Sequence, residues 1–452
     1  MSLPAPNLDA KADQRTTMEL GKVLPLTAEV REGHLFVGGV DMVKLARTEG
    51  TALMVYDEED LRSRMREYRE SFTAYQAEAL PAYASKAFLN KAMARIAKEE
   101  GMGLDVSGGG ELAIAQSVDF PMEKVIVHGN NKTETELREA IEAGTGRIVV
   151  DSDYELARVS RIAGELGKVQ EIYLRITPGV EADTHEYIKT GCEDSKFGFT
   201  LRDDFAFECI GEALKAENVH LAGLHMHIGS QIFALDPFKE AIDVMIALFA
   251  RVKSEYGYEL DELDVGGGPG IAYLAEEDPK PIAAFADVVF DGLHAACAKY
   301  DVKEPRILCE PGRSIAATAG ITLYTVGTLK VLPGLRNFVA VDGGMSDNIR
   351  TALYHAEYEA VIANKADLPR TEIVAIVGKH CESGDAVVLD GSLQTPEVGD
   401  IACVFSTGAY CRSMSSNYNG QCRPAVFFVK DGQARMVTRR ETYADLMACD
   451  ID

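Results

Sequence analysis

The chain has 452 residues, of which 46% are hydrophobic and 26% are charged, and its formal net charge at pH 7 is −25. This length allows two or three domains, and the composition is typical of a soluble protein. The acidic charge argues against a nucleic-acid partner, because a phosphate backbone needs basic patches. Any anionic ligand therefore requires a local cluster of arginine and lysine.

The N-terminal stretch and the cysteines exclude further classes. No segment approaches the roughly 18 uninterrupted apolar residues of a membrane helix. The polar stretch MSLPAPNLDAKADQRTTMELG lacks the apolar core of a secretory signal, so we expect a cytoplasmic location and no membrane partner. The nine cysteines are odd in number and scattered, which predicts neither a disulfide framework nor a metal site.

A series of β/α repeats begins at residue 82. Most segments between its strand-like runs, such as KTETELREAIEAG, have the periodicity of amphipathic helices. Eight such repeats favour a closed parallel barrel over an open sheet. The strand-like runs are residues 82–85, 103–107, 124–129, 147–152, 171–176, 221–229, 263–268 and 306–312.

After about residue 314 the pattern becomes mainly β, with turn signals such as LDG and KDG. The strand-like runs there are ITLYTVGTLKVL, NFVAVDGG, EIVAIVGKHC, DIACVFSTG and AVFFVKDGQARMV. Near the start, HLFVGGVDMVKL has the pattern of a β-hairpin that could pair into this domain, and TALMVY leads toward the barrel. We therefore expect a lead-in with strands joining the β domain over residues 1–47, a (β/α)8 barrel over 48–313 and a C-terminal β domain, sandwich-like or barrel-like, over 314–452.

Polar residues lie at or just past the predicted strand ends, where a barrel collects its functional groups. Some of them have simple structural explanations. We expect Asp151 to be the N-cap of the next helix, and His225 to be a core residue that faces the other side of the barrel wall from His227. Residues 181–198 are expected to form a loop over the barrel mouth. The strand-end residues are Lys86, Asp105, His128, Asp151, Arg175, His227, Gly266, Gly267, Gly268, Glu310 and Arg313.

The glycine run in LDVGGGPGIAY could bring backbone N–H groups close to a phosphate, with the Ser230 hydroxyl beside them. The run lacks the spacing of a P-loop. A phosphate site with a strand-end lysine, Lys86, and a strand-end carboxylate, Glu310, suits pyridoxal 5'-phosphate, on whose ring His227 could stack. From these residues alone, a barrel enzyme acting on a sugar phosphate remains an alternative.

A set of motifs in both predicted domains is more specific. They are YASKAFLNK, DVSGGGELAIA, VHGNNK, LRITPGVEADTHEYI, KFGF, HMHIGSQI, DVGGGPGIAY, EPGRSI, VDGGMSDNIRTALY, GKHCESGDAV and GAYCRSMSSNYN. With this set the chain resembles the alanine-racemase-like, fold type III class of pyridoxal-phosphate enzymes and, within it, the diaminopimelate decarboxylases. The resemblance runs from HLFVGGV to MVTRRET, and it implies a carboxy-lyase that converts meso-2,6-diaminopimelate to L-lysine and CO2, the last step of lysine biosynthesis.

The resemblance also implies the cofactor-binding residues. Lys86 matches the Schiff-base lysine, His227 the histidine stacked on the pyridine ring, and Ser230 a phosphate contact. Glu310 matches the group that faces the pyridine nitrogen, while Asp105 could instead serve only strand-end hydrogen bonding. The predicted cofactor-binding set is Lys86, Asp105, Arg175, His227, Ser230, Gly268, Glu310, Pro311, Gly312, Arg313 and Tyr410.

The substrate-binding residues follow from the same resemblance. Cys381 matches the proton donor of the CESGD motif, and in the family this cysteine and Glu382 reach across the interface of a head-to-tail homodimer with shared active sites. The predicted catalytic residues are Lys86 and Cys381, and the predicted substrate-binding residues are Arg313, Arg350, Tyr354, Glu382 and Tyr410.

Other functions within the class remain alternatives. Decarboxylases of ornithine, arginine or carboxynorspermidine usually alter the CESGD glutamate and lack an arginine matching Arg350, so Arg350 with Glu382 favours diaminopimelate. Alanine racemases set an arginine, rather than a residue like Glu310, against the ring nitrogen. Noncatalytic pyridoxal-phosphate proteins lack the β domain and CESGD or lose the lysine, and this chain keeps both.

The sequence departs from the family pattern at three positions. Thr351 stands where relatives usually have proline, His355 where glycine is common, and Pro269 where an aromatic or aliphatic residue is usual. The first two lie beside Arg350 and Tyr354. They therefore bear on the substrate rather than on the cofactor.

Overall fold

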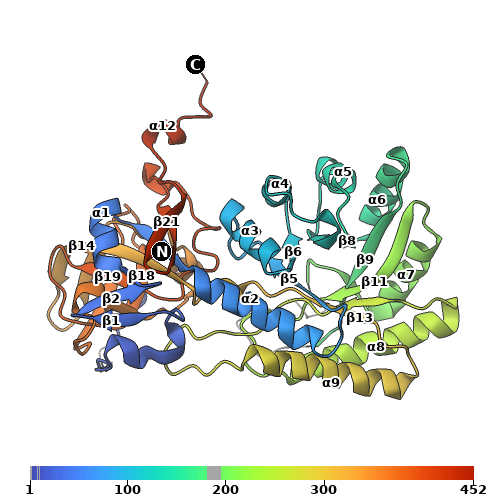
Figure 1. Cartoon of the computed structure of the whole chain (residues 1–452), viewed down its shortest axis with the longest axis horizontal. Coiled ribbons are helices and arrows are strands. Elements are labelled where there is room, and N and C mark those ends of the chain that lie inside the picture. The colour runs from blue at the N-terminus through green and yellow to red at the C-terminus, as the bar shows by residue number, and fades with distance from the viewer. Residues whose placement is uncertain (1–2, 8, 10, 181–194, 452) are drawn as a thin grey trace. The chain divides into compact units, whose positions relative to one another are not determined.

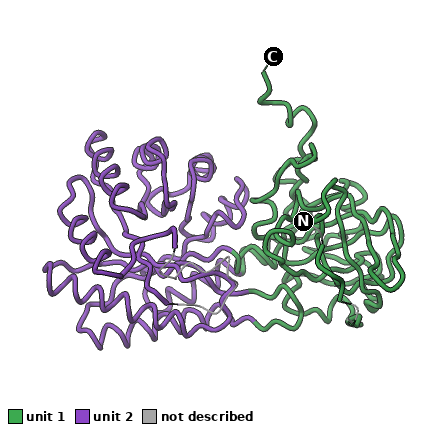
Figure 2. The backbone as a smooth tube through the Cα atoms, turned by 180° about the vertical axis from the view of Figure 1, so that it is seen from behind, with its two compact units in different colours: residues 1–63, 271–278, 313–452 green, residues 64–270, 279–312 purple. Residues whose placement is uncertain are grey.

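A computed structural model describes residues 3–7, 9, 11–180 and 195–451. The chain divides into two compact units (Figure 2). The β unit comprises residues 1–63, 271–278 and 313–452, and the barrel unit comprises residues 64–270 and 279–312. The division falls within helix α2 (Glu58–Thr73).

The barrel unit contains the predicted closed barrel of eight parallel strands. Successive strands pair in chain order, and the pairing of β13 with β5 closes the ring. A ninth strand, β10 (Phe199–Thr200), pairs with β9 outside the ring. The barrel strands are β5 (Leu80–Ala84), β6 (Gly103–Val106), β7 (Val125–Val127), β8 (Arg147–Val150), β9 (Gln170–Thr177), β11 (Val219–Met226), β12 (Glu262–Asp264) and β13 (Arg306–Cys309).

Helices lie outside these strands, above and below them in the view of Figure 1. Helix α5 shows why the sequence forms them: Thr133 caps its start in a capping box with Glu136, and Gly144 ends it in the left-handed conformation. The helices of this unit are α3 (Lys91–Glu99), α4 (Gly109–Gln116), α5 (Glu134–Ala143), α6 (Asp153–Glu165), α7 (Phe205–Lys215), α8 (Asp236–Tyr256) and α9 (Ile282–Tyr300), with 3-10 turns at Met122–Lys124 and Arg202–Asp204.

The inside of the barrel is packed with side chains. A buried cluster draws one residue from each of six strands, which fills the ring as expected for a barrel of this size. Its members are Ala82, Ile126, Val149, Tyr173, Ala222 and Leu308. The barrel is therefore solid in its middle, and a ligand can be bound only at an end.

The β unit is built on a second sheet, whose strand order is β18-β17-β15-β14-β4-β20-β21, with β19 pairing to β14 and β16. The predicted mainly β domain is thereby confirmed. Strand β4 (Leu53–Asp57), the TALMVY segment, pairs with β14 and β20 in this sheet. The other strands are β14 (Gly320–Val331), β15 (Asn337–Val341), β16 (Ala360–Ile362), β17 (Glu372–Val377), β18 (Ala386–Leu393), β19 (Ile401–Val404), β20 (Ala425–Lys430) and β21 (Gln433–Thr438).

The N-terminal segment of the β unit forms a small antiparallel sheet of its own, followed by helix α1 (Met42–Glu49). Its strands are β1 (Glu29–Arg31), β2 (His34–Val37) and β3 (Val40–Asp41). The short helices of the unit are α10 (Arg313–Ala316), α11 (Arg350–Tyr354) and α12 (Tyr443–Leu446), and its 3-10 turns are Thr17–Val23, Ala363–Lys365 and Tyr418–Gly420. Among the described residues, no helix combines the length and apolarity needed to span a membrane.

The amino ends of the barrel strands are joined by a buried carboxylate, Glu262, at the start of β12. Arg147 donates two hydrogen bonds to it at 2.7 and 2.9 Å, and Arg306 donates one at 2.9 Å. The Tyr173 hydroxyl donates a fourth at 2.5 Å. Burial acts to raise the pKa of Glu262, but the hydrogen bonds and charge of Arg147, together with the hydrogen bonds from Tyr173 and Arg306, outweigh burial and lower the pKa.

We predict that Glu262→Gln lowers the free energy of unfolding by about 2–3 kcal/mol, because two arginines lose their charged partner. Because the folded-state pKa is depressed, this contribution is complete above the unfolded-state value and is lost as the pH falls through the folded-state pKa. Urea unfolding should show a constant difference between variant and wild type at pH 6–8 and a smaller one below about pH 4.

The matched control is Glu171→Gln. The Glu171 side chain is 40% exposed and lies 3.9 Å from Arg147, so this change should cost less than about 0.5 kcal/mol. Equal effects of the two variants would contradict a special role for the buried carboxylate.

Candidate active site

Ionisable side chains form a connected cluster at the carboxyl ends of the barrel strands. Lys86 follows β5, and its Nζ lies 3.6 Å from Asp105 Oδ2 in β6. His128 follows β7, and its Nε2 lies 3.9 Å from Asp105 Oδ1 and 2.5 Å from Glu310 Oε1. Four strand ends thus contribute to one site, as predicted from their positions in the sequence.

Glu310 lies at the centre of this cluster and is only 5% exposed. One of its oxygens contacts His128, and the other lies 3.2 Å from Nε2 of His225. Burial acts to raise the pKa of Glu310, but the two imidazoles hold that pKa well below its usual range. The cluster therefore contains a buried carboxylate that is ionised at neutral pH.

His225 was predicted to face the other side of the barrel wall from His227, and this prediction is wrong. Residues two apart on an extended strand face the same side, and His225 points with Glu310 into the cluster. Burial lowers the pKa of both histidines, that of His227 well below its usual value with Lys86 and Arg175 adding to the shift. Both rings are therefore neutral at pH 7.

Asp105 is a buried carboxylate with unused hydrogen-bonding capacity. It is 1% exposed, and among the residues that the structure describes neither of its oxygens has a hydrogen-bond partner. Burial raises the pKa of Asp105, with the charges of His128 and Lys86 opposing the shift. A polar ligand at this site would satisfy these oxygens.

Arg175 and Asp151 lie beside this cluster. Their side chains approach to 4.0 Å, and the Arg175 guanidinium lies 4.4 Å from the centre of the Phe197 ring. The prediction that Asp151 caps the next helix is wrong: Ser152 is the N-cap of α6, and its side chain accepts the Glu155 N–H at 3.2 Å. Ser152 takes the N-cap position because it directly precedes Asp153, the first residue of the helix.

The glycine run packs tightly against neighbouring loops. A Cβ on Gly267 would lie 2.3 Å from the Glu310 carbonyl oxygen, and a Cβ on Gly268 would lie 2.9 Å from the Gly229 oxygen, in the loop that carries Ser230. Gly268 also has φ +142°, which favours glycine. Only glycine therefore fits where the run packs beside the loop of the predicted phosphate contact, Ser230.

The turn Glu310-Pro311-Gly312 is fixed to the strand that leads to Lys86. The Ala84 N–H donates to the Pro311 oxygen at 3.0 Å, and a Cβ on Gly312 would lie 2.9 Å from the Ala84 Cβ. The predicted residues of the barrel unit are thus brought together: Lys86, Asp105, Arg175, His227, Ser230, Gly268, Glu310, Pro311 and Gly312.

His128, His225 and Glu310 also present three ligand atoms within 4.8 Å of one another, a spacing that a metal ion could bridge. The Nε2 atoms of both histidines already contact the two carboxylate oxygens. The expectation that the protein uses no metal stays a prediction.

The β unit holds a second cluster, in which tyrosines surround two arginines. Arg313 donates to the Tyr273 hydroxyl at 2.5 Å, and its guanidinium lies 4.8 Å from the centre of the Tyr410 ring. Arg350 donates to the Tyr358 hydroxyl and lies 4.9 Å from the centre of the Tyr273 ring. Tyr273 thus contacts both arginines.

Arg350 is 6% exposed, and no described carboxylate forms a salt bridge with it. A buried guanidinium that has only tyrosine partners can take a bidentate anion. Tyr354 lies one turn along α11, on the same face as Arg350. Sequence reasoning missed Tyr273 and Tyr358, although Tyr273 ends the motif DVGGGPGIAY and Tyr358 lies four residues past the motif VDGGMSDNIRTALY.

Two of the departures from the family pattern have local explanations. The Thr351 hydroxyl donates to the Val387 oxygen at 2.8 Å, a bond that proline could not make. His355 ends α11 with φ +53°, the conformation for which glycine is common. Pro269 forms an isolated bridge with Ile232 next to the glycine run.

The CESGD loop of the β unit is held by Asp385. Its carboxylate accepts the Met345 N–H at 2.6 Å, and the backbone N–H and Nδ1 of His380, each at 2.8 Å. The following residue, Cys381, is exposed, and its N–H donates to Asn419 Oδ1 at 2.8 Å. Glu382 accepts the Gly384 N–H at 3.2 Å.

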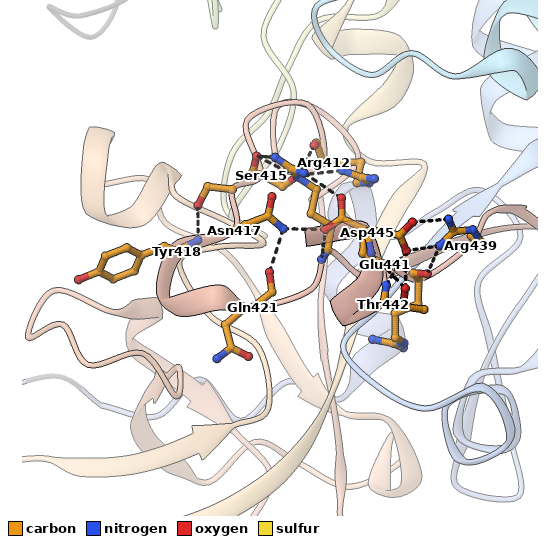
Figure 3. Close-up of polar contacts among 12 residues, drawn as sticks. Arg412, Ser415, Asn417, Tyr418, Gln421, Arg439, Glu441, Thr442 and Asp445 are labelled. Atoms are coloured by element: carbon orange, nitrogen blue, oxygen red, sulfur yellow. Dashed lines mark hydrogen bonds and ion pairs between the residues drawn. The ribbon is translucent and has the colours of Figure 1, made fainter. Parts of the chain in front are cut away.

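The segment that carries Asn419 is fastened to the chain's C-terminal part (Figure 3). Asn417 Nδ2 donates to the Gln421 oxygen at 3.0 Å and to Glu441 Oε2 at 2.6 Å, and Glu441 also pairs with Arg423 at 2.8 Å. The loop that carries Cys381 is thus held in place through Asn419 and the hydrogen bonds of its segment. The predicted loop over residues 181–198 lies largely outside the described residues, which resume at Ser195.

Comparisons with known proteins agree with the geometry. The model of the family described as pyridoxal-dependent decarboxylase, pyridoxal binding domain, matches residues 58–317. The diaminopimelate decarboxylase of Bacillus subtilis (strain 168) is 45% identical over 421 residues, which cover 93% of this chain and 96% of that protein. The enzyme of the same name from Mycobacterium tuberculosis (strain H37Rv) is 44% identical over 429 residues, covering 93% and 95%.

The chain is also similar to solved structures of diaminopimelate decarboxylases. The crystal structure of diaminopimelate decarboxylase from M. jannaschii in complex with L-lysine has a TM-score of 0.88 and 36% identity, and covers 94% of this chain and 98% of that one. The Helicobacter pylori enzyme complexed with L-lysine has a TM-score of 0.81 and 30% identity, and covers 90% and 98%.

Proposed function

The chain belongs to the diaminopimelate decarboxylase family of pyridoxal-dependent decarboxylases, and from this premise we propose that it converts meso-2,6-diaminopimelate to L-lysine and CO2. It would act as a pyridoxal-phosphate-dependent carboxy-lyase in lysine biosynthesis. The observation that carries the proposal is Glu310, a buried carboxylate held ionised in one cluster with the strand-end lysine Lys86.

The residues of the barrel unit fit pyridoxal phosphate. The unsatisfied oxygens of Asp105 offer hydrogen-bond acceptors that no described residue uses, and the glycine run packs against the loop that carries Ser230. When bound, the cofactor draws the electron pair left by the departing carboxylate into its protonated ring. Glu310 would stabilise the proton on the ring nitrogen, because an adjacent opposite charge favours the charged form. Lys86 would hold the cofactor through its amine, and His227 would stack on the ring as a neutral imidazole.

The remaining predicted cofactor contacts are Arg175, Ser230, Pro311, Gly312, Arg313 and Tyr410. We propose that Arg313, Arg350 and Tyr354 bind carboxylates of the substrate, with Glu382 and Tyr410 as further contacts. In a chain of net charge −25, these arginines supply the local positive charge that a dicarboxylate needs.

Cys381 Sγ is proposed to return a proton to the α-carbon after CO2 departs. We also propose a homodimer whose active sites share this loop. Glu382 lines a pocket of about 540 Å3 in the β unit, and the exposed apolar residues Leu353 and Tyr418 border the same pocket. Exposed apolar surface of this kind marks protein interfaces. A cytoplasmic location stays a prediction.

The substrate assignment is tested by offering the cofactor-loaded protein meso-diaminopimelate, ornithine, arginine and carboxynorspermidine in parallel. We expect lysine and CO2 from diaminopimelate only, and at least a roughly 1,000-fold loss of rate in Lys86→Ala, which cannot hold the cofactor covalently. Turnover of another substrate would leave the roles of Lys86 and Glu310 intact but contradict those of Arg350 and Glu382.

The role of the buried arginine gives a second prediction. Arg350→Lys should raise KM for diaminopimelate by roughly 10- to 100-fold with a smaller change in kcat, since a bidentate contact becomes a single one. Tyr358→Phe, which removes only the hydroxyl that Arg350 contacts, should raise KM by about 3- to 10-fold. Steady-state kinetics measure both, with Tyr154→Phe, the same change at a 69%-exposed tyrosine of helix α6, as a control expected to have no effect.

Shared active sites predict complementation between inactive subunits. Lys86→Ala and Cys381→Ala homodimers should each be inactive, while a mixture that has exchanged subunits should recover up to about one quarter of wild-type activity. Half of the dimers would then be mixed, and each would have one intact site of two. Failure of the exchanged mixture to recover any activity would show that each site is built from one chain.

A further inference from the structure

The two histidines on Glu310 are not accounted for by the roles proposed above. Each uses the same ring atom, Nε2, and each contacts a different oxygen of the carboxylate, at 2.5 Å for His128 and 3.2 Å for His225. The two rings meet edge to face, with centroids 4.8 Å apart. Each ring therefore fixes the other as well as the carboxylate.

The arrangement determines where the protons lie. A neutral imidazole that donates from Nε2 has a bare Nδ1. Nδ1 of His225 is buried and has no hydrogen-bond partner among the described residues. A core histidine would ordinarily have both ring nitrogens satisfied. The retained unsatisfied atom indicates that the contact to Glu310, rather than packing, determines the orientation of this ring.

The histidines also distinguish Glu310 from its acidic neighbours. Three buried carboxyl groups, Asp105, Asp264 and Glu310, interact in this part of the barrel. Burial raises the pKa of Asp105 and raises that of Asp264 well above its usual value. Glu310 is the one of the three to which imidazoles hydrogen-bond, and it is the one whose pKa is lowered. Lys86 and Arg175 are the cations that face the same cluster.

We propose that His128 and His225 are positioning residues, one imidazole on each oxygen, that keep the Glu310 carboxylate ionised and fixed toward the ring nitrogen of the cofactor. This inference rests on the proposed function and adds two residues to it. Neither histidine needs to touch the cofactor, since both act through Glu310.

Matched substitutions test the pair. His128→Gln and His225→Gln place an amide N–H near the former Nε2 and keep a donor, whereas Leu variants at the same positions remove it. We expect the Leu variants to lower kcat by roughly 10- to 100-fold, as for a lost hydrogen bond to a charged group, and the Gln variants to stay within about 5-fold of wild type. KM should change by less than about 2-fold in all four.

Two further readouts separate positioning from a structural role. Titration of the apoprotein with pyridoxal phosphate should show weaker binding in the Leu variants, and the absorbance of the loaded protein should titrate at a different pH from wild type. In a Glu310→Gln background, the Leu substitutions should cause no further loss, because the group through which they act is gone. If a Leu variant fails to fold, Asn at the same position serves instead, because its amide lies near Nδ1 and cannot reach Glu310.

The outcomes are distinct. Wild-type kcat, cofactor affinity and absorbance in the Leu or Asn variants would overturn the inference and leave the decarboxylase assignment standing. Losses that add fully to that of Glu310→Gln would overturn it too, because they would show a structural role. If the wild-type protein fails to decarboxylate diaminopimelate, the proposed function fails, while cofactor affinity and the absorbance titration still decide whether the histidines act through Glu310.

Discussion

The burial of an ionised carboxylate is the constraint around which the barrel end is organised. An isolated buried charge is costly and ordinarily becomes neutral through a shifted pKa. Glu310 is not neutralised in this way, because both of its oxygens accept hydrogen bonds from imidazoles. Those imidazoles must come from β7 and β11, so the closed order of the strands, rather than local sequence, creates the site.

The β unit contains a buried group of the opposite charge, the Arg350 guanidinium, in a chain that is acidic as a whole. Arg350 is held by phenol groups and ring faces instead of a carboxylate, which keeps its charge available for an anionic ligand. A carboxylate partner would have satisfied the guanidinium and competed with the substrate. The two units thus use the same principle with opposite charge: a buried ionised group is stabilised by hydrogen bonds to ring side chains and remains available to its ligand.

The sequence allowed the barrel, the β domain and the gathering of polar side chains at one end of the barrel to be predicted, because apolar runs locate strands and strand ends locate polar groups. What it could not show was which neighbours a strand-end residue would face. His225 was assigned to the wrong side, Asp151 lost the capping position to Ser152, and β18 was not predicted because its LDG triplet looks like a turn. Tyr273 and Tyr358 were missed because their contacts join segments far apart in the chain.

The two ends of the barrel contain similar residue types, but they differ in whether their buried polar atoms have hydrogen-bond partners. At the amino ends, Glu262 accepts four hydrogen bonds, and its partners Arg147, Arg306 and Tyr173 are all engaged. At the carboxyl ends, similar residue types leave both oxygens of Asp105 and one nitrogen of His225 unsatisfied. A fold that needed these groups only for stability would pair them, as it does at the other end. The unsatisfied atoms therefore mark the end at which a ligand completes the structure.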